Sequence, residues 1–329
     1  MGIIKNRRKF NHMIKKSKTI FLMAHKDLDL DALGSCIGIY NILSRKKKNC
    51  YIIIDDTSHE LGVEKVLIEL DGCLKIIKGE DLDKYLNKNP NNNLLLILDT
   101  NKKDRVQNKN VLDKIKNKIV IDHHDTGKTT INDCLLINDL EASSTCEMIT
   151  ELVEFYDIDL ESYYATVLLS GIVLDTNNFT LKTTSNTYYA AYYLSCLGAS
   201  ARKVQYLLKQ DIEEYRERQK LLTGIETINN KIAITKGSQY TIYNKEDLAK
   251  TADTLLFFNN IEASFVIGKI SKKTVGVSVR SLGNYNISSI LEKLGGGGND
   301  YNGAAQFEKK TISEVEQLIK KEIKKQEGE

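Results

Sequence analysis

The chain has 329 residues, and its 47 Lys and Arg against 44 Asp and Glu give a formal net charge of +3. This near neutrality argues against binding along a long nucleic acid, although it leaves room for a small nucleotide site. No apolar run approaches the roughly 18 residues of a membrane span, and the basic N-terminus lacks the apolar core of a secretory signal. The six cysteines are scattered without a CxxC pair, which predicts reduced thiols in a cytoplasmic protein.

Four short apolar runs in the N-terminal part of the chain each end in polar side chains. The runs cover 19–24, 51–54, 94–98 and 118–121, and they are followed by His25, Asp55, Asp99 and Asp122. Runs of this length, separated by stretches of helical character, predict buried parallel strands that alternate with helices. We therefore expect an α/β fold with a doubly wound, mainly parallel sheet. Ligands of such sheets bind beyond the carboxyl ends of the strands, where these polar residues lie.

The rest of the chain predicts further helices and a second, smaller α/β domain with a mixed sheet. Helices are expected at 143–157, 161–174, 186–198 and, in a charged stretch, 201–224. Beyond residue 230 we expect strands at 231–236, 263–270 and 274–281, and helices at 246–257, 286–294 and 312–327. A glycine run at 295–298 precedes a further possible helix start. The predicted boundaries are 1–198 for the N-terminal domain, 199–228 for a helical linker and 229–329 for the C-terminal domain.

Carboxylate and imidazole side chains gather at the predicted carboxyl edge of the first sheet. A lone histidine after a strand is more often structural, but crowded carboxylates repel one another and favour bound divalent cations. A mixed carboxylate and imidazole set suits Mn²⁺, Zn²⁺ or Fe²⁺ better than Ca²⁺. No cysteine lies at ligand spacing, which disfavours a structural zinc site. The candidate residues are His25, Asp29, Asp31, Asp99, Asp122, His123, His124 and Asp175.

Five motifs in order along the chain carry a resemblance to a known family. They are HxxxDxD at His25 to Asp31, LDT at 98–100, DHH at 122–124, SGIVLDTNNF at 170–179 and GGGG at 295–298. With these motifs the sequence resembles the RecJ-like DHH phosphoesterase superfamily, in the branch with a C-terminal DHH-associated domain. The sequences of its motifs look most like those of the catalytic region of cyclic-di-AMP phosphodiesterases. The oligoribonuclease (nanoRNase) branch is the next most similar.

The resemblance implies a catalytic N-terminal domain that binds two metal ions, usually Mn²⁺, with Fe²⁺, Co²⁺ or Mg²⁺ as other possibilities. It implies that His25 and Asp29 bind the first ion. It implies that Asp31, His123 and Asp175 bind the second ion and that Asp99 bridges the two. Two further residues are implied in catalysis: Asp122, which would orient a histidine, and His124, which would face the scissile phosphate.

The resemblance also implies a substrate-binding role for the C-terminal domain. Arg280 and the loop Gly296, Gly297, Gly298 would hold phosphate or base, and a phosphate cradle of backbone N–H groups fits such a loop. A surface charge and a flexible loop are the alternative interpretations of these residues. Asn299 stands where the family has a histidine, and this departure predicts weaker binding or a shifted choice of nucleotide. Ser144 is either a substrate contact or a helix cap.

The function that the resemblance implies is Mn²⁺-dependent hydrolysis of cyclic di-AMP to linear pApA by a metal-activated hydroxide, with the substrate between two lobes. The alternative is a pApA and short-oligoribonucleotide hydrolase (nanoRNase) that releases AMP. A pyrophosphatase is disfavoured by the glycine run, and a catalytically weak nucleotide sensor is the remoter alternative. The expected partners are a small cyclic or linear dinucleotide and a second copy of the chain in a homodimer. No long nucleic acid is expected, and no membrane segment is expected in this chain, although a longer parent chain could be membrane-anchored.

Overall fold

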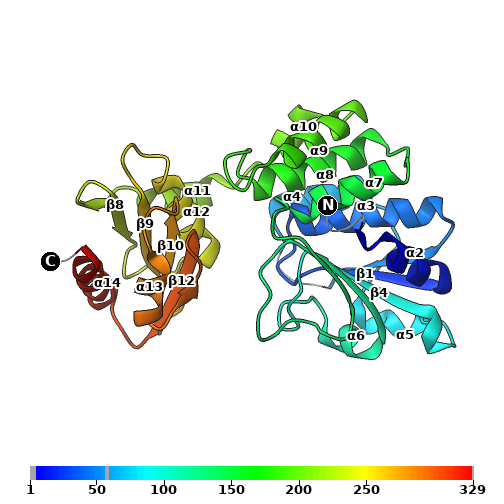
Figure 1. Ribbon diagram of the computed structural model, residues 1–329, viewed down its shortest axis with the longest axis horizontal. Helices are drawn as coiled ribbons and strands as arrows, with labels where there is room; N and C mark the ends of the chain where they lie inside the picture. The colour runs from blue at the N-terminus through cyan, green and yellow to red at the C-terminus, as the bar shows by residue number, and fades with distance from the viewer. Residues whose placement is uncertain (1–4, 56–58, 328–329) are drawn as a thin grey trace. The chain divides into compact units, whose positions relative to one another are not determined.

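The computed structural model describes residues 5–55 and 59–327, which form two compact units, Met1–Lys209 and Gln210–Glu329. Figure 1 colours the first unit from blue to green and the second from yellow-green to red. Each unit has its own sheet and its own hydrophobic clusters. Among the described residues, no helix has both the length and the apolar character needed to cross a bilayer.

The first unit is built on a six-stranded sheet in which every pairing is parallel. The sheet order is β3-β2-β1-β4-β5-β6, so the middle strands β1, β4 and β5 are neighbours. Met23 pairs with Ile97, and Leu98 pairs with Ile121, which brings the carboxyl ends of these three strands to one edge. The strands are β1 (Thr19–Met23), β2 (Asn49–Ile53), β3 (Ile76–Ile77), β4 (Asn93–Leu98), β5 (Asn117–Asp122) and β6 (Leu135–Asn138).

Helices cover both faces of this sheet. Because side chains alternate along a strand, Ile20 and Leu22 join a cluster with α3, α7 and α8, whereas Phe21 and Met23 join one with α6. This burial on both faces explains why each of these strands is a continuous run of apolar residues in the sequence. The helices are α2 (Arg7–Lys16), α3 (Leu30–Arg45), α4 (Leu61–Glu69), α5 (Leu82–Tyr85), α6 (Lys109–Lys114), α7 (Thr145–Phe155), α8 (Ser162–Asp175), α9 (Ser185–Cys196) and α10 (Ala201–Leu207).

Helices α3 and α8 pack at unusually close range because glycines lie at their contact (Figure 1). A Cβ at Gly171 of α8 would lie 2.8 Å from the Cα of Asp31 and 2.6 Å from the Sγ of Cys146. A Cβ at Gly34 of α3 would lie 3.2 Å from the carbonyl oxygen of Val167. A Cβ at Gly171 would be closer to its neighbours than real Cβ atoms come, and one at Gly34 would be tightly crowded, so these glycines help to set the spacing of the two helices.

The second unit has a mixed six-stranded sheet in the order β11-β12-β10-β9-β8-β7. Only the β8–β9 pair is parallel. One face packs against α13 and α14, and α12 packs against the other. The strands are β7 (Glu226–Ile228), β8 (Ile232–Lys236), β9 (Ala263–Lys269), β10 (Thr274–Ser281), β11 (Gly297–Gly298) and β12 (Asn302–Glu308), and the helices are α11 (Ile212–Lys220), α12 (Lys245–Leu255), α13 (Ile287–Lys293) and α14 (Ile312–Glu327).

The predicted fold class is confirmed, but two local predictions are wrong. The helix expected at 201–224 is two helices, α10 in the first unit and α11 in the second. The side chain of Asp211 accepts a hydrogen bond of 2.8 Å from the backbone N–H of Glu213, and so starts α11 as a new helix. The segment after the glycine run is strand β12 rather than a helix, because its backbone pairs with β10 over its whole length.

The glycine at the contact of α3 and α8 provides a test of this packing. Gly171→Ala is expected to lower the free energy of unfolding of the first unit by about 1–3 kcal/mol, because the added methyl group meets backbone atoms. Urea denaturation followed by circular dichroism measures the change. Gly127→Ala is the control, because a Cβ at Gly127 would meet no atom within 4 Å. If both variants had the same free energy of unfolding, the contact between α3 and α8 would not depend on the glycine at position 171.

Candidate active site

Asp99 is the centre of the acidic edge of the first sheet. It directly follows β4, is 3% exposed and has a φ of 59°, a left-handed conformation that is uncommon for a residue with a side chain. Its backbone N–H donates to the carbonyl of Ile121 at 3.0 Å, which holds it against β5. One carboxylate oxygen accepts from Thr145 Oγ1 at 2.9 Å, and the other lies 3.2 Å from His25 Nε2. Strained residues of this kind concentrate at functional sites.

His25 and Asp29 form one group with Asp99. His25 follows β1, and its Nε2 lies 3.6 Å from Asp29 Oδ2. Asp29 is the N-cap of α3, and its other oxygen accepts from the N–H of Ala32 at 2.9 Å. Burial by itself lowers the pKa of His25, but the charges and hydrogen bonds of Asp29 and Asp99 raise it to about 11. The group therefore attracts positive charge strongly.

Asp31, His123 and Asp175 form a second group. Asp31 is fully buried in the first turn of α3, where it accepts hydrogen bonds of 2.8 and 2.7 Å from the N–H groups of Thr145 and Cys146 at the start of α7. Asp175 ends α8, and its Oδ2 lies 3.1 Å from His123 Nε2. Burial, together with the charges of Asp99 and Asp175, raises the pKa of Asp31 well above its usual range.

The donor set fits divalent cations. Potential ligand atoms of His25, Asp29 and Asp99 lie within 4.8 Å of one another, and so do those of Asp31, His123 and Asp175. Nε2 of His123 is buried and faces the carboxylates of Asp99 and Asp175, but in the described part of the chain it makes no well-aligned hydrogen bond. A buried polar atom without a partner is costly, and a metal ion would supply one. These two groups contain the residues that the resemblance implies for the two ions, and Asp99, His123 and His124 form a third group of the same kind.

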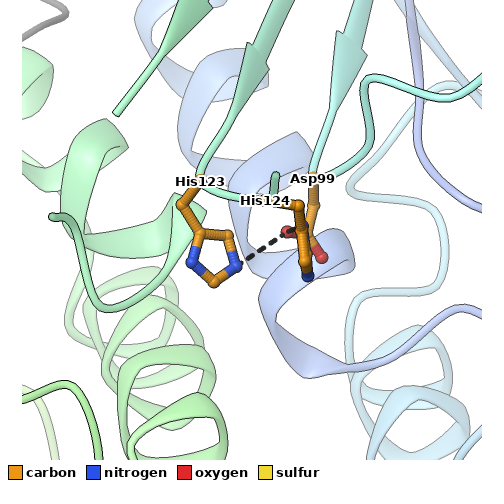
Figure 2. A group of neighbouring side chains, drawn as sticks. All are labelled: Asp99, His123 and His124. Carbon is orange, nitrogen blue, oxygen red and sulfur yellow. Dashed lines mark ion pairs between the residues drawn. The ribbon is translucent and has the colours of Figure 1, made fainter. Parts of the chain in front are cut away.

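Asp122 and His124 lie beside this cluster. The fully buried carboxylate of Asp122 accepts from His124 Nδ1 at 2.8 Å, from Asn101 Nδ2 at 2.6 Å and from the N–H of His123 at 2.9 Å. Figure 2 shows His123 and His124 together after one strand, with Asp99 after its neighbour. The His124 side chain is 44% exposed, whereas that of His123 is 4% exposed. Asp122 therefore orients the exposed histidine of the pair.

Sequence reasoning did not identify Asn101, Thr145 or Cys146 as supports of the acidic cluster. Asn101 follows the LDT motif directly, so its position beside the motif was the available signal. Ser144 is fully buried and caps α7 by accepting from the N–H of Glu147 at 3.0 Å. Its cap holds the N-terminus of α7 against Asp31.

The predicted substrate residues lie in the second unit. Arg280, near the end of β10, donates through Nε to Asp253 Oδ1 at 2.6 Å and through Nη1 to its neighbour's carbonyl at 3.0 Å. Burial of Asp253 raises the pKa of its carboxyl, although Arg280 opposes this. Asp253 therefore fixes the guanidinium through one edge. Within the described residues, Nη2 of Arg280 has no hydrogen-bond partner.

The glycine run forms a turn and the short strand β11 rather than a long flexible loop. A Cβ at Gly296 would lie 2.5 Å from a carbonyl of β12, and one at Gly298 would lie 2.4 Å from another. Gly297 has no atom within 4 Å of an added Cβ, so packing gives no reason for a glycine there. Asn299 Oδ1 accepts from the N–H groups of Tyr301 and Asn302 at 2.9 and 3.0 Å and builds the β11–β12 turn.

Comparison with known proteins assigns the chain to a family. Residues 19–172 match the DHH family, N-terminal domain, and residues 229–325 match the DHHA1 domain. The chain therefore carries a DHH N-terminal domain followed by a DHHA1 domain. The first match contains all the ligand-type residues except Asp175, which lies just beyond its end. The second match contains Arg280 and the glycine run.

Two curated relatives and two solved structures illustrate the similarity. The chain is 38% identical over 93% of its length to the cyclic-di-AMP phosphodiesterase PdeA of Listeria monocytogenes, of which it spans 47%. It is 26% identical over 85% of its length to the bifunctional oligoribonuclease and PAP phosphatase NrnA of Thermus thermophilus, covering 81% of that protein. The chain thus spans about half the length of the phosphodiesterase.

The solved structures support the fold. An exopolyphosphatase-related protein from Bacteroides fragilis superposes with a TM-score of 0.78 at 20% identity, covering 97% of this chain and 95% of that one. RecJ from Thermus thermophilus in complex with Mn²⁺ superposes with a TM-score of 0.52 at 15% identity, covering 97% of this chain and 54% of that one.

Thr145 provides a test of how the cluster is held. Thr145→Val keeps the side-chain size but removes the hydroxyl that donates to Asp99. We expect Mn²⁺ binding, measured by calorimetric titration, to weaken by about 10–100-fold, because groups that orient metal ligands typically contribute that much. Thr150→Val is the matched control, because Thr150 Oγ1 donates to the carbonyl of Cys146 inside α7. Equal affinities in the two variants would count against a role for Thr145.

Proposed function

We propose that this chain is the catalytic part of a Mn²⁺-dependent phosphodiesterase that hydrolyses cyclic di-AMP to linear pApA. The observation that carries the proposal is that Asp99 lies between two groups of ligand-type residues, with Oδ2 3.2 Å from His25 Nε2 and Oδ1 3.5 Å from His123 Nε2. His25 and Asp29 would hold one ion, Asp31, His123 and Asp175 the other, and Asp99 both. The similarity to a cyclic-di-AMP phosphodiesterase supports the substrate, and the Mn²⁺ in the RecJ structure supports the ion. A homodimer and a cytoplasmic location remain predictions.

The chemistry of the proposal divides between the ions and the protein's own residues. A pair of divalent cations lowers the pKa of water and stabilises the charge that develops on a phosphate under in-line attack. Asp122 accepts from Nδ1 of His124, which leaves Nε2 of the exposed ring as the atom that contacts the phosphate. Asn101 Nδ2 and the N–H of His123 also donate to the carboxylate of Asp122, and these hydrogen bonds keep its orientation fixed.

Residues of the second unit would recognise the nucleotide. Arg280 would contact phosphate through Nη2, since Nε is occupied by Asp253. Gly297 would let phosphate or base approach the backbone, because no packing demand explains its missing side chain. Asn299 would act mainly by shaping the turn, because its Oδ1 already accepts two hydrogen bonds.

A pApA and short-oligoribonucleotide hydrolase is the alternative function, favoured by the similarity to NrnA, of which the chain covers 81%. Turnover of cyclic di-AMP beside pApA, with Mn²⁺ and chromatographic separation of the products, separates the two. Conversion of cyclic di-AMP that stops at pApA supports the proposal. Slow ring opening with rapid AMP release from pApA supports the alternative. Bound metal without turnover of any nucleotide would overturn both and indicate a sensor.

The shared position of Asp99 predicts a severe loss of activity in its amide variant. Asp99→Asn is expected to reduce kcat/KM by about a thousandfold or more, because the two proposed ions would lose the anionic ligand that lies between His25 and His123. Asp27→Asn is the control, since Asp27 is an exposed carboxylate in the same HKDLDLD segment and outside both groups. Steady-state kinetics at saturating Mn²⁺ measure both variants. Near-normal turnover in Asp99→Asn would refute the two-ion centre.

Substitution of Arg280 is expected to weaken substrate binding rather than to slow turnover. Arg280→Ala is expected to raise KM by about 10–100-fold with little change in kcat, because one charge-assisted hydrogen bond is worth about 1.5–3 kcal/mol. Arg216→Ala is the control, since Arg216 pairs with Glu213 on the surface, where such pairs contribute little. Thermal melting checks that the loss of the partner of Asp253 leaves the unit folded. A fall in kcat with unchanged KM would assign Arg280 to the chemical step instead.

A further inference from the structure

A lysine-rich cavity of about 1050 Å³ lies within the second unit, outside the residues assigned above to catalysis and substrate binding. It is lined by the ends of β8 and β9, by the turn before β10, and by the residues that join β12 to α14. Seven of its lining residues are lysines, and its one lining carboxylate is Glu217. The cavity is therefore a concentration of positive charge in a chain whose formal net charge is only +3.

Most of this charge is not neutralised by the protein. Lys220 pairs with Glu217, and Lys236 pairs with Glu316 at 2.7 Å. The five other lysines form no ion pair with any described residue. Like charges held together raise the potential of a cavity and favour a bound anion. These five are Lys269, Lys272, Lys273, Lys309 and Lys310.

Backbone hydrogen bonds hold the lysine-bearing segments around the cavity. The N–H of Lys309 donates to the carbonyl of Lys273 at 2.9 Å, and the N–H of Tyr243 donates to the carbonyl of Lys269 at 2.7 Å. Lys309 has a φ of 57°, so the chain turns sharply at this point. The charged side chains thus project from a fixed frame rather than from independent loops.

The start of α14 adds to the positive potential. Thr311, Ile312 and Ser313 line the cavity, and they begin a helix of 16 residues. The N-terminus of a helix carries a partial positive charge and free N–H groups that suit anions. Glu314 accepts from the N–H and the hydroxyl of Thr311 at 2.7 and 2.8 Å, and Thr311 Oγ1 accepts from the N–H of Glu314 at 3.2 Å. This cap occupies two N–H groups, and its carboxylate offsets part of the positive potential of the helix start.

The cavity is separate from the predicted substrate residues. Thr274 pairs with Glu308 at the cavity end of the sheet, whereas Arg280 pairs with Asn302 at the opposite end. Six residue steps along β10 correspond to roughly 20 Å at about 3.4 Å per residue. A ligand in the cavity would therefore not occupy the position assigned to the substrate phosphate.

The lining chemistry defines the class of ligand. Lysines recognise phosphate as point charges, and no arginine lines the cavity to provide planar, bidentate recognition. Its only lining aromatic residue, Tyr243, is 5% exposed, so the lining itself offers no platform for stacking single-stranded bases. We propose that this cavity binds a small ligand that carries several phosphate groups, such as a nucleoside triphosphate or an inorganic oligophosphate. The proposal does not depend on the hydrolase activity.

Calorimetric titration of the full chain with inorganic tripolyphosphate tests the proposal. The buffer contains no divalent cation, so the acidic cluster of the first unit repels the probe. The variant is Lys272→Gln, Lys273→Gln, Lys310→Gln, which removes three exposed and unpaired charges from the cavity. The control is Lys245→Gln, Lys321→Gln, Lys324→Gln, which removes three exposed charges of the same unit outside the cavity.

We expect one tripolyphosphate per chain, a dissociation constant about tenfold or more higher in the cavity variant, and no change in the control. Absence of binding to the unaltered chain, or equal weakening in both variants, would overturn the proposal. Tighter binding of a 12-nucleotide RNA than of tripolyphosphate, lost in the same cavity variant, would also overturn it in favour of a nucleic-acid surface.

Discussion

The approach of two ligand groups to one carboxylate, that of Asp99, constrains the architecture of the first unit. Asp29, Asp31 and Asp175 bring further carboxylates to the same edge, and like charges at this range repel unless cations or hydrogen bonds offset them. The protein offsets part of the repulsion itself. Two N–H groups at the start of α7 bind Asp31, and the hydroxyl of Thr145 binds Asp99. The repulsion between carboxylates that remains is what makes this edge suitable for divalent cations.

Sequence patterns were sufficient for β1, β2, β4 and β5 of the first sheet and for the polar residues that follow them, but they missed the short strands β3 and β6. The strands of a doubly wound sheet are buried on both faces, so their apolar runs stand out, and the residues that follow them must meet at one edge. The supporting contacts were harder to predict. Asn101 reaches Asp122, and α7 reaches Asp31 across 114 residues of chain, and no local pattern encodes such pairings.

The second unit was less predictable because its decisive contacts do not depend on periodicity. Strand β12 has the sequence NGAAQFE, whose small residues give little strand signal, and its pairing with β10 determines its conformation. The orientation of Arg280 depends on Asp253, which lies on α12 and belongs to no motif. Asn299 was interpreted as a replaced ligand contact, whereas its side chain builds a turn. The ligand-type residues of the first unit and the recognition residues of the second thus differ in how directly sequence reveals them.

The glycine contact between α3 and α8 ties catalytic geometry to core packing. Asp31 lies on the first of these helices and Asp175 at the end of the second, so anything that spreads the helices moves both carboxylates together. Displacements of about 1 Å are enough to reduce an enzyme's rate by about a hundredfold. Many substitutions that disturb this cluster should therefore map to the interior of this unit rather than to the cluster itself. A genetic screen for lost function would recover positions that no comparison of active-site residues would select.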